Sequence, residues 1–99
     1  MASTKEYRDF ILGQLNSLDN ITYKSMMGEY LLYYKGLLFG GIYDDRFLVK
    51  KVDENKKYKM DEQNPYEGAK SMYLVDDVDN VDNLKKIVLD TCNGIEKNK

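Results

Sequence analysis

The sequence predicts a two-layer α+β domain, in which a mostly antiparallel sheet carries its helices on one face. Apolar residues recur at helical spacing near both ends of the chain. Between residues 21 and 52, runs of β-forming residues are separated by Gly-containing or Asp-rich turns. Helices bury their apolar stripes against one face of such a sheet. The expected order is helix, four strands, helix, strand and helix (α-β-β-β-β-α-β-α), in one domain spanning residues 1–99.

The first helix is expected over residues 3–18. Ser3 and Glu6 have the spacing of a capping box, in which two side chains satisfy the free backbone N–H groups at the start of a helix. An apolar face follows at helical spacing, made of Tyr7, Phe10, Ile11, Leu15 and Leu18. Asp19 and Asn20 are expected to end the helix.

Four strands are expected next, over residues 21–27, 29–35, 37–43 and 46–52. The second alternates, with Tyr30, Leu32 and Tyr34 on one face and Leu31 and Tyr33 on the other, as in half-buried sheet strands. Gly28, the pair Lys35 and Gly36, and the pair Asp44 and Asp45 supply the turns, because Gly and Asp tolerate left-handed backbone.

The second half of the chain is expected to return to helices. Residues 53–61 read as a short helix capped by Asp53, residues 62–70 as a loop and residues 71–75 as a strand. Asp79 or Asn80 caps a last helix that reaches residue 95, followed by a frayed tail. The apolar face of that helix is Val81, Leu84, Ile87, Val88, Cys92 and Ile95.

Adjacent glycines inside a strand need an explanation. Gly40 and Gly41 predict a β-bulge or a close approach of another backbone. The functional alternative is a ligand held against the bare backbone. Cys92 is expected to be a small buried hydrophobe. Met26, Met27 and Met72 are expected to pack in the core, and the alternative is a partner-binding surface.

The composition argues against most catalytic chemistry. The chain has no histidine and one cysteine, which excludes imidazole-activated nucleophiles and the usual zinc ligand sets. The acidic run over residues 76–82 does not match the known calcium loop, and helix capping explains it. We therefore expect a protein that is not an enzyme and uses no cofactor or metal. The alternative left open is a small-ligand binder or enzyme of unknown reaction, using Lys, Tyr and carboxylate groups around the two glycines.

The charge distribution offers a second alternative. The net charge is −2, but residues 46–60 hold six basic and two acidic residues, whereas residues 61–82 hold seven acidic residues and one lysine. A nucleic-acid-binding domain would use the basic segment, residues 46–59, together with neighbouring tyrosines. Its candidate contacts are Arg46, Lys50, Lys51, Lys56, Lys57 and Lys59. No apolar run is long enough to span a bilayer and the N-terminus lacks an apolar signal core, so a cytoplasmic location with no membrane partner is expected.

Two segments carry a resemblance to a known family. SMMGEYLLYYKG followed by GGIYDDRFLVK, and the later PYEGAKSMYLVDDVDN, are similar to the N-terminal domain of the TfoX/Sxy competence regulators. The first matches include Leu32, and the later ones Pro65, Ala69, Lys70 and Met72. The family-motif residues are Met27, Gly28, Tyr30, Tyr33, Gly36, Asp45, Leu48, Lys50, Tyr66 and Gly68.

The resemblance implies a secretion-chaperone-like α+β fold with no enzymatic activity and no cofactor. Full-length regulators of this family act in the transcription of competence genes through a protein partner, and they carry a C-terminal helical domain. We expect this chain to lack that second domain. The expectation is therefore a stand-alone, non-catalytic protein-interaction module, an accessory factor in transcription regulation. Its partner would be another protein or a second copy, in a homodimer, bound through an exposed apolar patch or a sheet edge.

Overall fold

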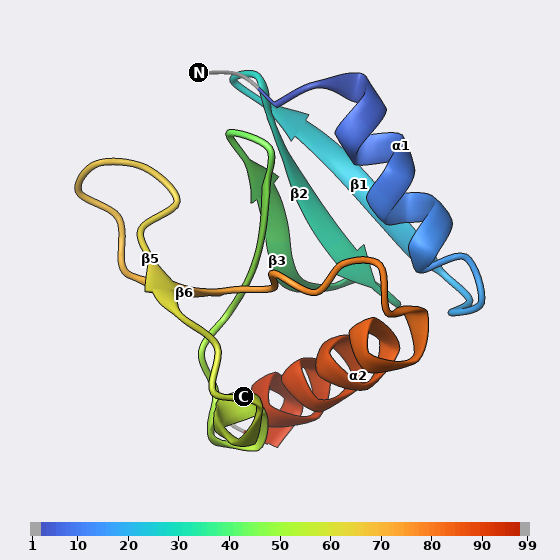
Figure 1. The fold of residues 1–99 in the computed structure, drawn as a ribbon, viewed down its shortest axis with the longest axis vertical. Helices are drawn as coiled ribbons and strands as arrows, with labels where there is room; N and C mark the ends of the chain where they lie inside the picture. The colour runs from blue at the N-terminus through green and yellow to red at the C-terminus, as the bar shows by residue number, and fades with distance from the viewer. Residues whose placement is uncertain (1–2, 98–99) are drawn as a thin grey trace.

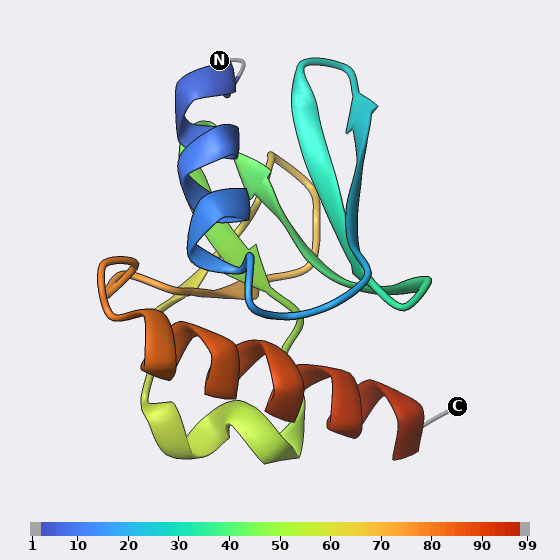
Figure 2. The ribbon, with the colours of Figure 1, turned by 90° about the vertical axis from the view of Figure 1, so that its right-hand side faces the viewer.

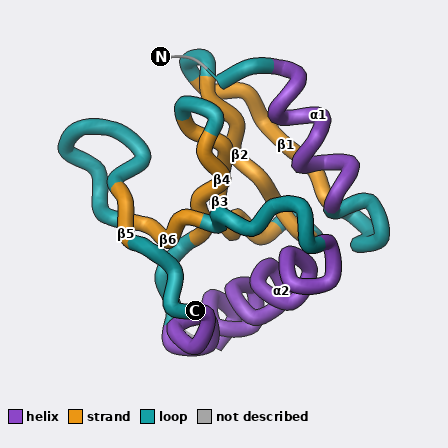
Figure 3. The backbone as a smooth tube through the Cα atoms, in the orientation of Figure 1, coloured by secondary structure: helices purple, strands orange, loops and turns teal. Residues whose placement is uncertain are grey.

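One antiparallel sheet organises the molecule, and the computed structural model describes residues 3–97. Within that part of the chain, six strands follow the order β1-β2-β3-β4-β6-β5, and every neighbouring pair is antiparallel (Figure 1, Figure 3). The strands are β1 (Ile21–Met26), β2 (Glu29–Tyr34), β3 (Leu37–Tyr43), β4 (Arg46–Val49), β5 (Glu62–Gln63) and β6 (Met72–Leu74). The helices are α1 (Lys5–Gln14), the 3-10 helix η1 (Asp53–Tyr58) and α2 (Val81–Lys97). The predicted two-layer α+β fold is confirmed.

The core lies between the sheet and the two α-helices, which share one side of it (Figure 2). Two rows of paired residues face the helices: Tyr30 beside Ile42 and Phe47, and Leu32 beside Gly40 and Val49. The helices fill the other side with Ile11, Leu15, Leu84, Ile87, Val88 and Cys92, all buried. Burial of this apolar stripe, rather than helix propensity, holds the helices in place.

The two strand glycines sit where the β2–β3 register shifts. Leu32 pairs with Gly40 but Tyr33 pairs with Leu38, so β3 carries one extra residue, Phe39. This bulge lets Phe39 join the core on the same side as Ile42, three positions away. A side chain at either glycine would collide with backbone: an added Cβ at Gly40 would lie 2.2 Å from the Leu48 carbonyl oxygen. Both structural explanations predicted for these glycines, bulge and close backbone approach, are confirmed.

Three tight turns connect the first four strands. The turn residues all have left-handed backbone, at φ 53° and 85° for Met27 and Gly28 and 51° and 79° for Lys35 and Gly36. Asp44 and Asp45 adopt the same conformation. Two-residue turns of this hand match the right-handed twist of the strands they join. The turns expected from Gly and Asp therefore form where the sequence placed them.

The predicted start of the first helix is wrong by two residues. Thr4, not Ser3, caps α1, and its hydroxyl accepts the Tyr7 N–H at 3.1 Å. The Ser3 hydroxyl is instead used by the hairpins: it accepts the Asp45 N–H at 3.1 Å and contacts Glu29. The helix ends at Gln14 rather than residue 18, and turns follow as far as residue 20. Leu15 and Leu18 still pack on the core.

Other boundaries differ because side-chain contacts compete with propensity. Asn55, not Asp53, holds the start of η1, accepting the Val52 N–H at 3.1 Å. This helix ends at Tyr58, and the expected loop that follows contains the short strand β5. Asn80 caps α2 through the Asn83 N–H, one of the two predicted candidates. The last helix continues to Lys97, beyond the predicted end at residue 95, and the rest of the expected tail, residues 98–99, lies outside the described residues.

Four side chains expected in the core or on an apolar helix face are exposed. Met27 at the β1–β2 turn is 97% exposed, and Met26 is 40% exposed. Phe10 in α1 is 40% exposed, and Val81 in the first turn of α2 is 37% exposed. Met26 and Met27 lie at the tip of a hairpin, where no layer covers them. Cys92 is buried as predicted, and burial raises the pKa of its thiol to about 11. The alternating tyrosines also behave as predicted, with Tyr30 buried and its neighbours half-buried.

Candidate ligand cleft and interaction edge

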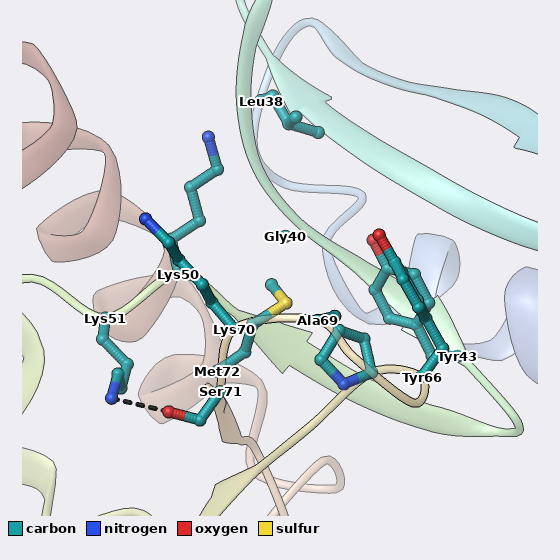
Figure 4. A pocket seen from close by; sticks show the side chains of 11 residues that line it. Leu38, Gly40, Tyr43, Lys50, Lys51, Tyr66, Ala69, Lys70, Ser71 and Met72 are labelled. Atoms are coloured by element: carbon teal, nitrogen blue, oxygen red, sulfur yellow. Dashed lines mark hydrogen bonds between the residues drawn. The ribbon is translucent and has the colours of Figure 1, made fainter.

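A cleft of about 690 Å³ lies between β3 and the segment 65–72, and we call it the β3 cleft (Figure 4). Its lining residues are Leu38, Gly40, Tyr43, Lys50, Lys51, Pro65, Tyr66, Ala69, Lys70, Ser71 and Met72. The lysines stand on one side and the two tyrosines on the other, with Gly40 and Met72 between them (Figure 4). The volume lies in the range of small-molecule sites.

Arg46 fixes the wall of the cleft. Its guanidinium donates to the Gln63 side chain at 2.8 Å and to the Asn64 and Pro65 carbonyls at 3.3 and 3.2 Å. Its Nε also donates to the Tyr43 carbonyl at 3.1 Å. A planar guanidinium suits this fork of acceptors. One side chain from β4 therefore ties the 63–65 segment to the end of β3.

A second tie closes the far end of the same wall. The Lys51 ammonium lies 2.6 Å from a Glu62 carboxylate oxygen and donates to the Ser71 hydroxyl at 2.7 Å. The Ser71 hydroxyl donates to the same Glu62 oxygen at 3.1 Å. The lysine contact, then the hydroxyl, lowers the pKa of Glu62. The charge of Lys51 is thus matched by Glu62 inside the protein.

Lys50 and Lys70 differ from Lys51. Neither ammonium forms an ion pair or side-chain hydrogen bond within the described residues. Both side chains lie on the same side of the cleft (Figure 4). The cleft therefore presents two cations that no carboxylate of the described chain neutralises.

The opposite side of the cleft is aromatic. Tyr43 is buried, and Tyr66 is 59% exposed, with ring centroids 6.4 Å apart and planes tilted by 51°. Burial first, and then the neighbouring Tyr66, Glu29 and Tyr33, raises the pKa of Tyr43. Its hydroxyl therefore keeps its proton at neutral pH and remains a hydrogen-bond donor.

The predicted nucleic-acid contacts are largely paired within the protein. Arg46 and Lys51 hold the cleft wall, as above. Lys56 lies 3.0 Å from Asp53, and Lys57 lies 3.1 Å from Asp90. Lys50 and Lys59 have no acidic partner among the described residues. Of the six candidate contacts in the basic segment, two lysines therefore have no acidic partner among the described residues.

The other open feature is the free edge of the sheet at β1. Five of the six β1 residues are exposed, including Tyr23 at 43%. β1 lies on the outer side of its hairpin, with no helix or loop along its free side (Figure 2). The opposite edge of the sheet is β5, which has two residues.

The backbone of β1 alternates between bonded and free groups. The Asn20 carbonyl accepts the Lys35 N–H at 3.0 Å, which places the ladder bonds at even-numbered β1 positions. The odd positions, Ile21, Tyr23 and Ser25, therefore direct their N–H and C=O groups outward. Such a row of free groups is a template for pairing with another strand.

Comparison with known proteins identifies the family to which the chain belongs. The family model described as the TfoX N-terminal domain matches residues 13–88. The chain belongs to the TfoX N-terminal domain family. Among curated proteins it is 31% identical over 80 residues to an uncharacterized 12.7 kDa protein in the trpE 5' region of Spirochaeta aurantia, covering 79% of this chain and 70% of that protein. No solved structure matches significantly.

Most of the predicted TfoX motif residues build the fold. Met27, Gly28 and Gly36 form the turns, and Gly68 also has positive φ. Tyr30 and Leu48 are buried, and Tyr33 is half-buried on the helix-free face of the sheet. Asp45 accepts the Thr4 N–H at 2.8 Å and so positions α1. The exceptions are Lys50 and Tyr66, which line opposite sides of the β3 cleft.

Sequence reasoning missed the cleft as a unit. Its members come from β3, from the residues after β4 and from the segment 65–72, so no local spacing reports them. The one usable signal was the pair of glycines in β3, one of which lines the cleft. Among the described residues, no three His, Cys, Asp or Glu side chains form a group able to hold a metal ion. No helix of the described chain is long and apolar enough to cross a membrane.

Proposed function

We propose that this TfoX-domain chain is a non-catalytic protein-interaction module whose contact surface is the free edge of β1. The observation that carries the proposal is the row of outward backbone groups at Ile21, Tyr23 and Ser25. The edge has little of the usual protection, because β1 has no proline and Lys24 is its single charged residue. The tip of its hairpin presents Met26 and Met27. Exposed methionine is adaptable and common at partner surfaces.

The partner that we favour for this edge is a second copy of the chain. Antiparallel pairing about a two-fold axis at Tyr23 places outward groups opposite outward groups, with Ile21 beside the second copy's Ser25. Lys24 then lies opposite Thr22 rather than its own copy, so like charges do not meet. The TfoX membership supports a regulatory setting, and we propose an accessory role in transcription regulation in the cytoplasm.

The test replaces one outward N–H. Ser25→Pro removes a donor that β2 does not use, whereas Ser25→Ala keeps it as the matched control. We expect the wild-type and alanine proteins to elute as dimers in size-exclusion chromatography with light scattering, and the proline variant as a monomer. Circular dichroism should show that all three proteins are folded.

A wild-type monomer at a concentration of about 100 µM, a weak-affinity limit, would reject self-pairing. The edge itself is then tested with native lysate. Proteins captured by the wild-type and alanine forms but lost from the proline form would support strand addition by another protein. Equal capture by all three would reject β1 as the contact surface.

A further inference from the structure

We propose that the β3 cleft binds a small organic anion with a planar aromatic body, its carboxylate or phosphate at Lys50 and Lys70 and its ring against Tyr66. This site is separate from the β1 edge, and it assigns a binding role to TfoX motif residues Lys50 and Tyr66. The inference comes from the chemistry of the two sides of the cleft and from its size.

The cationic side selects an anion. Lys50 and Lys70 have no carboxylate partner within the described residues, while their neighbour Lys51 is held by Glu62 and Ser71. Glu62 in this wall neutralises Lys51, whereas no acidic residue of the wall pairs with Lys50 or Lys70. Lysine ammonium groups bind phosphate and carboxylate as point charges.

The aromatic side selects a flat, partly apolar body. Tyr66 is 59% exposed, and its ring contacts that of the buried Tyr43. Pro65, Ala69 and Met72 add an apolar lining. A planar ring packs on a tyrosine face in an offset or edge-to-face arrangement.

The cleft has a hydrogen-bonded wall and a volume suited to a small ligand. Its volume of about 690 Å³ is that of sites for molecules of nucleotide size or smaller. The three contacts from Arg46 to residues 63–65 hold its wall without a ligand. Gly40 lies between the lysines and the tyrosines and, having no side chain, leaves that part of the cleft open (Figure 4).

A single strand of nucleic acid is the less favoured occupant. Strand binding needs a cationic track that follows successive phosphates. Outside the cleft, Lys56 and Lys57 are already paired with Asp53 and Asp90. Within the cleft, only Lys50 and Lys70 are unpaired cations, which is fewer than a strand with successive phosphates would need.

The test is an NMR titration of the full chain with four probes: adenosine monophosphate, adenosine, inorganic phosphate and indole-3-acetate. We expect amide shifts at Gly40 and residues 66–72, with dissociation constants in the range of about 0.01–1 mM for at least one aromatic anion. Adenosine and phosphate, which each lack one half of the ligand, should bind at least about tenfold more weakly than adenosine monophosphate, if the nucleotide binds. Comparing the nucleotide with indole-3-acetate distinguishes phosphate from carboxylate recognition.

Variants assign the binding to the named groups. Lys70→Ala and Tyr66→Ala should each weaken the tighter aromatic anion by about tenfold or more, because each removes one side of the site. Lys86→Ala, on the exposed face of α2, is the charge-matched control and should bind as wild type. Ser25→Pro should also bind as wild type, so the outcome is independent of the β1 proposal.

Three results would overturn the inference. One is the absence of cleft shifts with both aromatic anions at about 10 mM. Another is equal weakening by Lys86→Ala and Lys70→Ala, which indicates non-specific charge attraction. The last is binding of an oligonucleotide more than about tenfold tighter than that of the mononucleotide, with amide shifts that extend to Lys56 and Lys59. That result would indicate a nucleic-acid strand as the ligand.

Discussion

Substitution by alanine is expected to affect the stability of the protein in opposite directions at two helix glycines. Gly13 is in α1, is exposed, and has no atom within 4 Å of an added Cβ. Gly94 is buried in α2, where an added Cβ would lie 2.5 Å from a Glu54 carboxylate oxygen and 2.6 Å from Val52 Cβ and Cγ2. α2 packs directly on η1 at this point (Figure 2). Substitution by alanine therefore tests how closely the two helices approach.

The magnitudes follow from two terms. Alanine in place of glycine favours a helix by about 0.5–1 kcal/mol, and this term applies to both positions. At Gly94 the helices must also separate by about 1 Å to restore ordinary contact, and overpacking of this kind costs about 1–3 kcal/mol. Gly13→Ala should thus raise the free energy of unfolding by up to about 1 kcal/mol. Gly94→Ala should lie about 1–3 kcal/mol below it.

The assay is urea and thermal unfolding followed by circular dichroism, with both variants and wild type measured together. One kcal/mol corresponds to about 4–8 °C in a domain of this size. The difference between the two variants isolates the packing term, because the propensity term nearly cancels. If Gly94→Ala is as stable as Gly13→Ala, then the contact between α2 and η1 is looser than described and the reasoning fails.

Two further predictions concern buried groups. Asn55→Ala should lower the free energy of unfolding, measured with urea, by about 1–3 kcal/mol, because the Val52 N–H and the Lys50 carbonyl lose their bonds to the Asn55 amide. The Thr91 hydroxyl loses the bond that it accepts from Asn55 but keeps the one that it donates to the Ile87 carbonyl. A loss below about 0.5 kcal/mol would show that water replaces the amide. Cys92 should react with a thiol reagent only after unfolding, because burial raises the pKa of its thiol to about 11. The thiol keeps its proton to a higher pH in the folded state than in the unfolded state, so its contribution to stability is complete below about pH 9 and is lost as the pH rises toward 11. The Cys92→Ala variant should lack this loss. Equal alkaline destabilisation of the wild type and the variant would contradict the assignment.

The sequence-based predictions were most accurate for elements that are specified by residues close together in the chain. The turn at Lys35 and Gly36 and the turn at Asp44 and Asp45 form as predicted, because the left-handed conformation is a property of the residues themselves. The Ser3 cap was wrong for a reason the local pattern does not contain. The hydroxyl of Ser3 binds Asp45 and Glu29, which are 42 and 26 residues away, and the neighbouring Thr4 takes over the cap.

The candidate sites show the same division. A basic segment was visible in the sequence, but which of its charges stay free depends on acids elsewhere in the chain. Asp90, which pairs with Lys57, lies on α2 and is 33 residues away in sequence. The guanidinium of Arg46 donates hydrogen bonds to the carbonyls of residues 64 and 65. Likewise, β1 was predicted as a strand, while its position at an edge follows only from the pairing order of the sheet.

By itself, the sequence determined the α+β class, the hairpin turns, the capped C-terminal helix and the resemblance to the TfoX family. These properties rest on backbone preference and hydrophobic period, which act over a few residues. Only the tertiary structure decided that Lys50 and Lys70 stand unpaired across a cleft from Tyr66, that Arg46 is a clamp and that β1 is open. Those outcomes depend on contacts between distant segments, because charge pairing and exposure are set by which surfaces the packed core brings together.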